Sequence, residues 1–227
     1  TGRVMDGSFK SEFLGSSEII DTDHPSIQAK ATELASEATQ GDVDSPSSSA
    51  KIILRCFEFV RDEIEHSSDF HRNPVTCKAS AVLEHGTGFC YAKSHLLAAL
   101  LRANGIPTGL CYQRLTISDD GSGPPYCLHG LNAVYLEKNN VGDGQASGSW
   151  FRIDPRGVKP GITKAEFCPP TELLAFPIQT AGEFDFPGVY VDPLPQIVET
   201  LHSCVTWNDV LDNLPDLDAA PLIPTRK

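Results

Sequence analysis

The residues of this 227-residue sequence that could carry out chemistry are a cysteine, a histidine and an aspartate, in that order along the chain. Cys90 follows Gly86-Thr-Gly-Phe and opens an apolar segment that we expect to be a helix. At a helix N-terminus, unpaired N–H groups and the helix dipole favour the thiolate, which is the nucleophilic form of cysteine. Glycines 86 and 88 would let a substrate backbone approach, and the Cys90 N–H would face a developing oxyanion. A packing role for this cysteine is the alternative.

The base and its orienting group would be His129 and Asp154. His129 begins a predicted strand, and Asp154 ends the next one, just before Pro155. If these strands are antiparallel neighbours, the start of one lies beside the end of the other. The imidazole could then deprotonate Cys90 while the carboxylate fixes its tautomer. Taken singly, His129 could be a solvated loop residue and Asp154 a turn former.

One helix and three strands are expected to position these side chains. Residues 90–104 are apolar on most sides and end at Asn104-Gly105 with Pro107 beyond, which predicts a buried central helix. Strands are predicted at 109–116, 129–136 and 149–154, separated by turn-rich stretches. Helices followed by an antiparallel meander indicate an α+β domain.

Further helices are predicted before Cys90. One begins near Asp23, as a capping acid, and Pro25, and the linker 41–49 separates it from the next. A short helix is expected to end at Gly86. The helix after the linker is expected to bury Ile53, Phe57, Val60 and Ile64 and to expose Arg61, Asp62 and Glu65.

The chain changes character from Pro169 onward, where nine of the 17 prolines lie. We expect an extended arm over 176–190, a helix capped by Asp192 with Pro193 in its first turn, and a short helix with a capping box at Thr206. The predicted organisation is a catalytic core with the N-terminal helices over 1–175, and an arm over 176–227 that packs on the same core.

The net charge of −12 lies at the two ends of the chain. Residues 1–50 and 176–227 each carry −6, whereas residues 51–175 have 13 charges of each sign. The acidity argues against binding to nucleic acid or to an anionic membrane. The longest aliphatic run, 96–101, is too short to span a bilayer, and residues 1–15 show no export signal, so we expect a cytoplasmic protein.

The seven cysteines are scattered, odd in number and lack a Cys-x-x-Cys pair, so most are expected to be reduced and buried. A zinc site formed by Cys127 and His129 with Cys77 or Cys90 ranks below catalysis, because no short-spaced pair of ligands supports it. The other six histidines are expected to be surface or helix-packing residues. We expect no cofactor and no metal.

Three blocks of the sequence resemble the transglutaminase-like superfamily. They are the stretch from Gly86-Thr-Gly-Phe-Cys90 to Arg102-Ala-Asn-Gly-Ile-Pro107, then His129-Gly-Leu-Asn-Ala-Val, then Trp150-Phe-Arg-Ile-Asp-Pro155. The resemblance covers about residues 50 to 160. It implies a papain-like transglutaminase core in which Cys90 is the nucleophile, His129 the base and acid, and Asp154 the orienter.

Two features of the animal enzymes do not carry over. Their oxyanion tryptophan has no counterpart before Cys90, since the only tryptophans are Trp150 and Trp207. Their calcium dependence has none either, because Asp119-Asp-Gly-Ser lacks the spaced ligands of a calcium loop. Only the Cys90 N–H is therefore assigned to the oxyanion.

The resemblance implies a cysteine enzyme, similar to bacterial cysteine proteases of this superfamily, that acts on a peptide or amide substrate through a thioester. Hydrolysis is favoured because water is always available and no site for an acceptor amine can be identified in the sequence. The alternatives are an acyltransferase that cross-links proteins, and a binding module that keeps the fold without turnover.

Overall fold

The computed structural model describes residues 8–40, 48–118, 121–137, 148–159 and 164–221. The helical elements are α1 (Ser8–Glu12), α2 (Pro25–Thr39), α3 (Ser48–Glu58), the π-helix η1 (Phe59–Glu63), α4 (Ala79–His85), α5 (Cys90–Ala103), α6 (Pro195–Ser203) and α7 (Trp207–Asp212). The strands are β1 (Glu65–His66), β2 (Thr87–Gly88), β3 (Thr108–Thr116), β4 (Tyr126–Glu137), β5 (Gly148–Ile153), β6 (Glu166–Cys168), β7 (Thr171–Leu173) and β8 (Phe184–Asp185).

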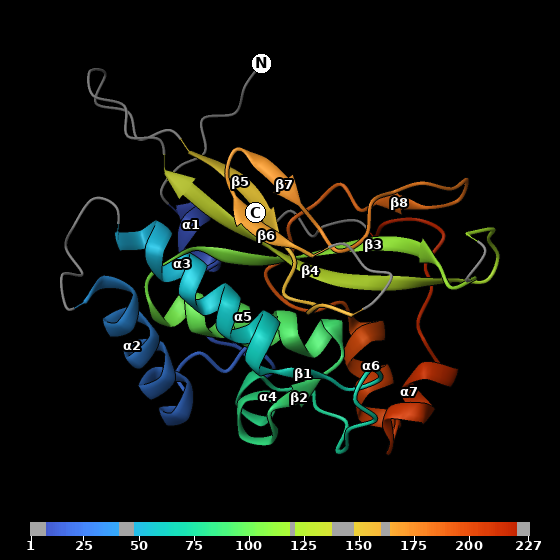
Figure 1. The fold of residues 1–227 in the computed structure, drawn as a ribbon, viewed down its shortest axis with the longest axis horizontal. Coiled ribbons are helices and arrows are strands. Elements are labelled where there is room, and N and C mark those ends of the chain that lie inside the picture. The colour runs from blue at the N-terminus through green and yellow to red at the C-terminus, as the bar shows by residue number, and fades with distance from the viewer. Residues whose placement is uncertain (1–7, 41–47, 119–120, 138–147, 160–163, 222–227) are drawn as a thin grey trace.

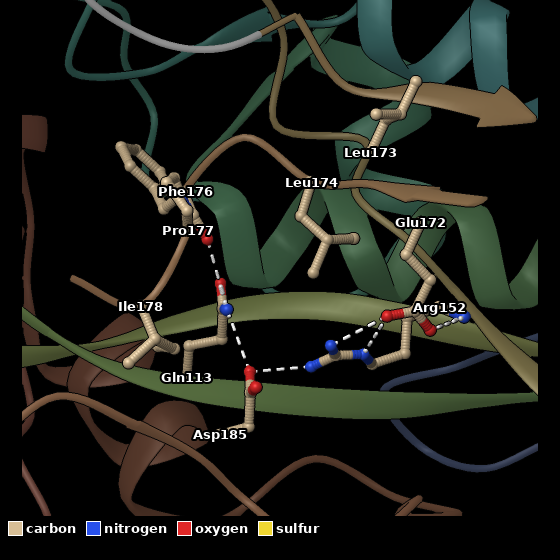
Figure 2. A pocket seen from close by; sticks show the side chains of 9 residues that line it. All are labelled: Gln113, Arg152, Glu172, Leu173, Leu174, Phe176, Pro177, Ile178 and Asp185. Atoms are coloured by element: carbon tan, nitrogen blue, oxygen red, sulfur yellow. Dashed lines mark hydrogen bonds and ion pairs between the residues drawn. The ribbon is translucent and has the colours of Figure 1, made fainter.

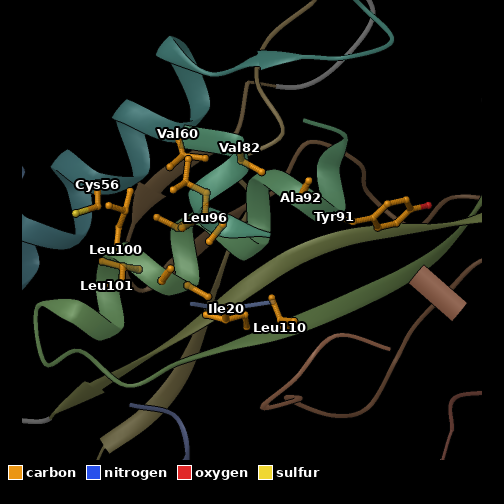
Figure 3. Packing of buried hydrophobic residues seen from close by; sticks show 14 of the residues in the cluster. Ile20, Cys56, Val60, Val82, Tyr91, Ala92, Leu96, Leu100, Leu101 and Leu110 are labelled. Atoms are coloured by element: carbon orange, nitrogen blue, oxygen red, sulfur yellow. The ribbon is translucent and has the colours of Figure 1, made fainter. Parts of the chain in front are cut away.

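Helix α5 is the central element, and its prediction is confirmed. Every residue from Cys90 to Arg102 is buried. The helix ends as expected, with Gly105 at φ +71° and the Ile106 N–H bonded to the Leu101 carbonyl. Figure 3 shows its leucines between α3 and the sheet, and each fully buried leucine contributes about 1.5–3 kcal/mol of hydrophobic stabilisation.

The predicted meander is also confirmed. The sheet has the order β5-β4-β3-β8, and β4 is antiparallel to both β3 and β5. Figure 1 shows α2, α3 and α5 on one side of this sheet and the β6–β7 hairpin beside its edge strand β5. The domain is therefore α+β, as predicted.

The two faces of the sheet follow the alternation of side chains along β4. Asn132 faces α5 and donates from Nδ2 to the Ser94 carbonyl at 2.9 Å. Leu131 and Ala133 belong to a small separate cluster with Cys111 of β3. We call the side of the sheet that carries this cluster the outer face.

Two details of the N-terminal helices differ from prediction. The N-cap of α2 is His24, whose Nδ1 accepts from the Ser26 N–H at 3.3 Å, and not Asp23. Arg61 was expected to be exposed but is only 7% exposed, because the π-helical turn of η1 changes which side chains face inward. Its guanidinium donates to the Ala165 carbonyl at 2.9 Å.

The other expectations here are met within the described residues. Ile53, Phe57, Val60 and Ile64 are buried, and α4 ends at His85 with Gly86 in the left-handed conformation. The expected linker falls outside the described residues, apart from Ser48 and Ser49, which begin α3.

The C-terminal segment contains both a correction and a confirmation. Helix α6 begins at Pro195 with Leu194 as its N-cap, and not at Asp192 and Pro193. The reason is that a residue before proline is held extended, and Leu194 has ψ 136°. The capping box of Thr206 at the start of α7 is confirmed.

Several strands were missed. The β6–β7 hairpin and β8, which pairs with β3 inside the expected extended arm, consist of two or three residues each. Such strands are too short to show a period of two in the sequence. Buried residues of the arm, including Tyr190, Leu194 and Ile197, share one apolar cluster with α5.

In the described part of the chain, which includes all seven cysteines, each cysteine is a free thiol. Four are buried, Cys127 and Cys204 are half-buried, and Cys168 is exposed. No helix among the described residues is long and apolar enough to cross a membrane.

Candidate active site

Cys90 is the first residue of α5, where the sequence predicted it. Phe89 is the N-cap, and β2 leads directly into the helix. As the first helical residue, Cys90 has no acceptor for its N–H within the helix. Its side chain is buried, with 8% of the residue exposed.

The two glycines before Cys90 each have a structural role in the fold. Gly86 ends α4 at φ +65°. A Cβ at Gly88 would lie 3.0 Å from Ala92 Cβ and 3.2 Å from Thr76 Oγ1, so this glycine lets β2 pack against the first turn of α5.

His129 and Asp154 are brought together by the pairing of β4 with β5. The last pair of this register is Asn132 with Ile153, so Asp154 leaves β5 beside the part of β4 that contains His129. His129 Nε2 lies 2.8 Å from Asp154 Oδ2. Asp154 is 0% exposed and His129 is 4% exposed, so water does not screen this contact.

Asp154 is held by two further hydrogen bonds. Its Oδ1 accepts from the Arg156 N–H and its Oδ2 from the Ala175 N–H, both at 3.1 Å. Burial alone would raise the pKa of Asp154, but His129 and these two amides outweigh burial and lower it. The carboxylate is therefore ionised at neutral pH.

The environment of His129 favours its protonated form. Burial alone would lower its pKa, but the charges of Asp154 and Cys90 and the hydrogen bond to Asp154 raise it to about 10. With Nε2 bonded to Asp154, the other ring nitrogen is the one available to Cys90. The Phe176 ring meets the imidazole edge to face, with centroids 4.9 Å apart.

A group of charged side chains, in which Asp69 and Arg156 are largely buried, supports Asp154. Asp69 forms two hydrogen bonds with the guanidinium of Arg156, whose Nη2 lies 3.0 Å from Oδ1, and Lys159 Nζ lies 3.1 Å from the same oxygen. Although burial opposes it, these bonds and the nearby positive charges lower the pKa of Asp69. Since the Arg156 N–H binds Asp154, Asp69 holds a residue that positions the site.

His66 and Lys93 lie next to this group and line a cavity of about 140 Å³ together with Asp69 and Arg156. Burial lowers the pKa of His66 well below 6.5 and that of Lys93 to about 7. Lys93 Nζ donates to the Ile64 carbonyl at 2.6 Å, which fastens α5 to the end of η1. The His66 ring is buried against the Phe89 ring, with centroids 5.4 Å apart.

Four residues of the site could not be predicted from the sequence, because each reaches the site only through tertiary contacts: Asp69, Arg156, Ala175 and Phe176. Among the described residues, no group of three or more His, Cys, Asp or Glu side chains is arranged to hold a metal ion.

The geometry defines a class of protein, namely an α+β domain with a cysteine at the start of its central helix and a buried histidine–aspartate pair on the adjoining sheet. Residues 33–155 match the family model described as the transglutaminase-like superfamily. The chain belongs to this superfamily, and its fold is the transglutaminase core.

Solved structures show similarity to this fold. They include a "putative cysteine protease" from Cytophaga hutchinsonii (19% identity, 67% of this chain and 43% of that chain, TM-score 0.45). The periplasmic domain of TgpA from Pseudomonas aeruginosa (19% identity, 67% and 48%, TM-score 0.43) and the transglutaminase of red sea bream (11% identity, 63% and 27%, TM-score 0.35) are also similar. The matches thus span less than half of each of these chains. No protein of curated function matches the sequence.

Proposed function

We propose that this protein is a cysteine enzyme that cleaves amide or peptide bonds through a thioester, with Cys90 as nucleophile, His129 as acid and base, and Asp154 as orienter. The observation that carries the proposal is the buried contact of 2.8 Å between His129 and Asp154, together with the position of Cys90 as the first residue of α5.

The first half of the proposed reaction forms the thioester. Cys90 Sγ, as thiolate, attacks the amide carbonyl carbon, and the Cys90 N–H at the helix start stabilises the oxyanion. The imidazolium of His129 then protonates the amide nitrogen, the C–N bond breaks and the amine leaves. Asp154 stabilises the imidazolium before this transfer and fixes the tautomer of the neutral ring after it.

The second half consumes the thioester. Neutral His129 takes a proton from water, whose oxygen attacks the thioester carbon, and the C–S bond breaks. The products are a carboxylic acid and the restored pair of thiolate and imidazolium. An amine in place of water would give a new amide, which is the transferase alternative.

Alkylation by iodoacetamide near neutral pH, followed by peptide mass spectrometry, tests the nucleophile. We expect Cys90 to react faster than Cys168, although Cys168 is exposed and Cys90 is buried. Four other thiols serve as inert references, because burial raises the pKa of Cys56, Cys77, Cys111 and Cys127 to about 12. If Cys90 reacts no faster than Cys168, and His129→Ala changes nothing, the proposal is wrong.

An activated ester such as p-nitrophenyl acetate tests the intermediate. Intact-protein mass should show one acetyl group on the wild type and none on Cys90→Ala. Adding increasing amounts of an amine during turnover then separates the two acceptors, since a hydrolase releases acetate and a transferase releases the acetamide.

A further inference from the structure

A second cavity, of about 340 Å³, adjoins the proposed active site on the outer face of the sheet. Figure 2 shows it between strand β3 and the segment 172–178. Gln113 lies opposite His129 in the register of β3 and β4, so the two side chains are neighbours on one face. Phe176 lines the cavity and also contacts the His129 ring.

The charged residues of this cavity leave one negative charge in excess. Arg152 is bound by two carboxylates, with Glu172 Oε2 at 2.8 Å and Asp185 Oδ1 at 2.7 Å. One guanidinium thus faces two carboxylates.

Two acceptor atoms of residues that line the cavity are unused among the described residues. Gln113 is 1% exposed, and its Nε2 donates to Asp185 Oδ1 at 2.9 Å and to the Phe176 carbonyl at 3.3 Å. Its Oε1 is buried and has no hydrogen-bond partner, and Asp185 Oδ2 accepts no hydrogen bond from any described residue. A buried amide oxygen without a donor is destabilising, and a hydrogen bond from a ligand N–H would remove that cost.

The remaining lining is apolar and includes Leu174, Phe176 and Ile178. Apolar sides around two free acceptors and one excess negative charge suit a flexible aliphatic stem that ends in a cation. We propose that this cavity binds an alkylammonium group, such as a lysine side chain of a peptide substrate, through Gln113 Oε1 and Asp185 Oδ2. The ammonium is bound there for recognition and does not react.

The position of the cavity assigns it to one side of the cleaved bond, and this step rests on the proposed function. His129 protonates the leaving nitrogen, so the amine half of the substrate lies on the His129 side of Cys90. Since Phe176 separates His129 from the cavity, the residue released as the amine is the one whose side chain enters it.

Binding of n-pentylammonium and of 1-pentanol, which has the same stem without the charge, tests the cavity without turnover. Two-dimensional NMR of Cys90→Ala should show the ammonium shifting the Gln113 side-chain amide. The affinity for n-pentylammonium should exceed the affinity for 1-pentanol by about tenfold, or about 1.4 kcal/mol. The reason is that the ammonium makes a charge-assisted hydrogen bond, which the alcohol lacks. Equal affinities, or shifts that avoid Gln113, overturn the proposal.

Asp185→Asn in the same background should abolish the preference for the ammonium. Asp216→Asn is the matched control, because Asp216 also pairs with an arginine, Arg114, and has a similarly exposed side chain, but lies outside the cavity. Equal losses in both variants would show a general effect of charge and overturn the proposal. If Asp185→Asn fails to fold, Gln113→Met, which removes the free acceptor, replaces it.

Matched peptides with lysine or norleucine on the amine side of the cleaved bond provide the activity test. We expect kcat/KM to be about tenfold higher for lysine in the wild type, and equal for both peptides in Asp185→Asn. Ammonium binding without turnover would leave the cavity assigned and refute the proposed function. Turnover by Cys90 without a preference for lysine would support the proposed function and overturn the assignment of the cavity.

Discussion

The replacement Asp154→Asn tests the proposed site most directly, because it changes one buried group and keeps its size. Asp154 accepts from His129, from the Arg156 N–H and from the Ala175 N–H. All three partners are donors, so the NH₂ of an asparagine must face one of them. The variant therefore loses at least one hydrogen bond, together with the charge that stabilises the imidazolium.

The size of the effect follows from these contacts. A hydrogen bond to a charged group contributes about 1.5–3 kcal/mol. At 1.36 kcal/mol for each factor of ten, losing that stabilisation of the thiolate–imidazolium pair should slow the alkylation of Cys90 roughly 10- to 150-fold. His129 would also titrate at lower pH, since the Asp154 charge is one of the causes that raise its pKa to about 10.

The assay is the rate of Cys90 alkylation from pH 5 to 9, measured by peptide mass relative to Cys168 in the same sample. In the wild type the ratio of the two rates should be highest at low pH, because His129, whose pKa is raised to about 10, stays protonated and paired with Cys90 over this range. In Asp154→Asn the ratio should be lower and should depend less on pH. A variant ratio equal to that of the wild type at every pH would refute the role given to Asp154.

Three further predictions concern the groups around the site. Asp69→Asn should lower the free energy of unfolding at neutral pH by about 1–3 kcal/mol. Because the pKa of Asp69 is lowered in the fold, the stabilisation by Asp69 is lost as the pH falls below about 4. Denaturation curves of the variant and the wild type should therefore converge in acid. In Gly130→Ala the new Cβ would lie 2.9 Å from the Tyr91 ring and 3.1 Å from Tyr91 Cα. This overlap should lower the free energy of unfolding by about 1–3 kcal/mol and slow Cys90 alkylation. Gly15→Ala, whose Cβ has its nearest contact at 3.5 Å, should leave the stability and the alkylation rate unchanged. Deleting residues 176–227 removes Phe176 from His129 and Ile197 from the core, so cooperative thermal unfolding should be lost, and a truncated chain that still unfolds cooperatively would contradict the predicted packing of the arm.

The elements with strong local signals were predictable from the sequence. The apolar run from Cys90 and the stop at Asn104-Gly105 define α5, because helix ends depend on residues within one turn. The period of two along 129–136 predicted β4, because this alternation is also a local pattern. The capping box at Thr206 needs only residues three apart.

The sequence by itself thus determined which residue begins the central helix and in what order the candidate cysteine, histidine and aspartate occur. Only the tertiary structure decided that β5 stops pairing at Ile153, which brings Asp154 to His129, and that Ala175 and Phe176 return to the same place. Only it decided that Arg61 is buried and that Gln113 keeps a free acceptor. The physical reason is that periodicity and capping are local, whereas strand register and burial depend on contacts between segments far apart in the chain.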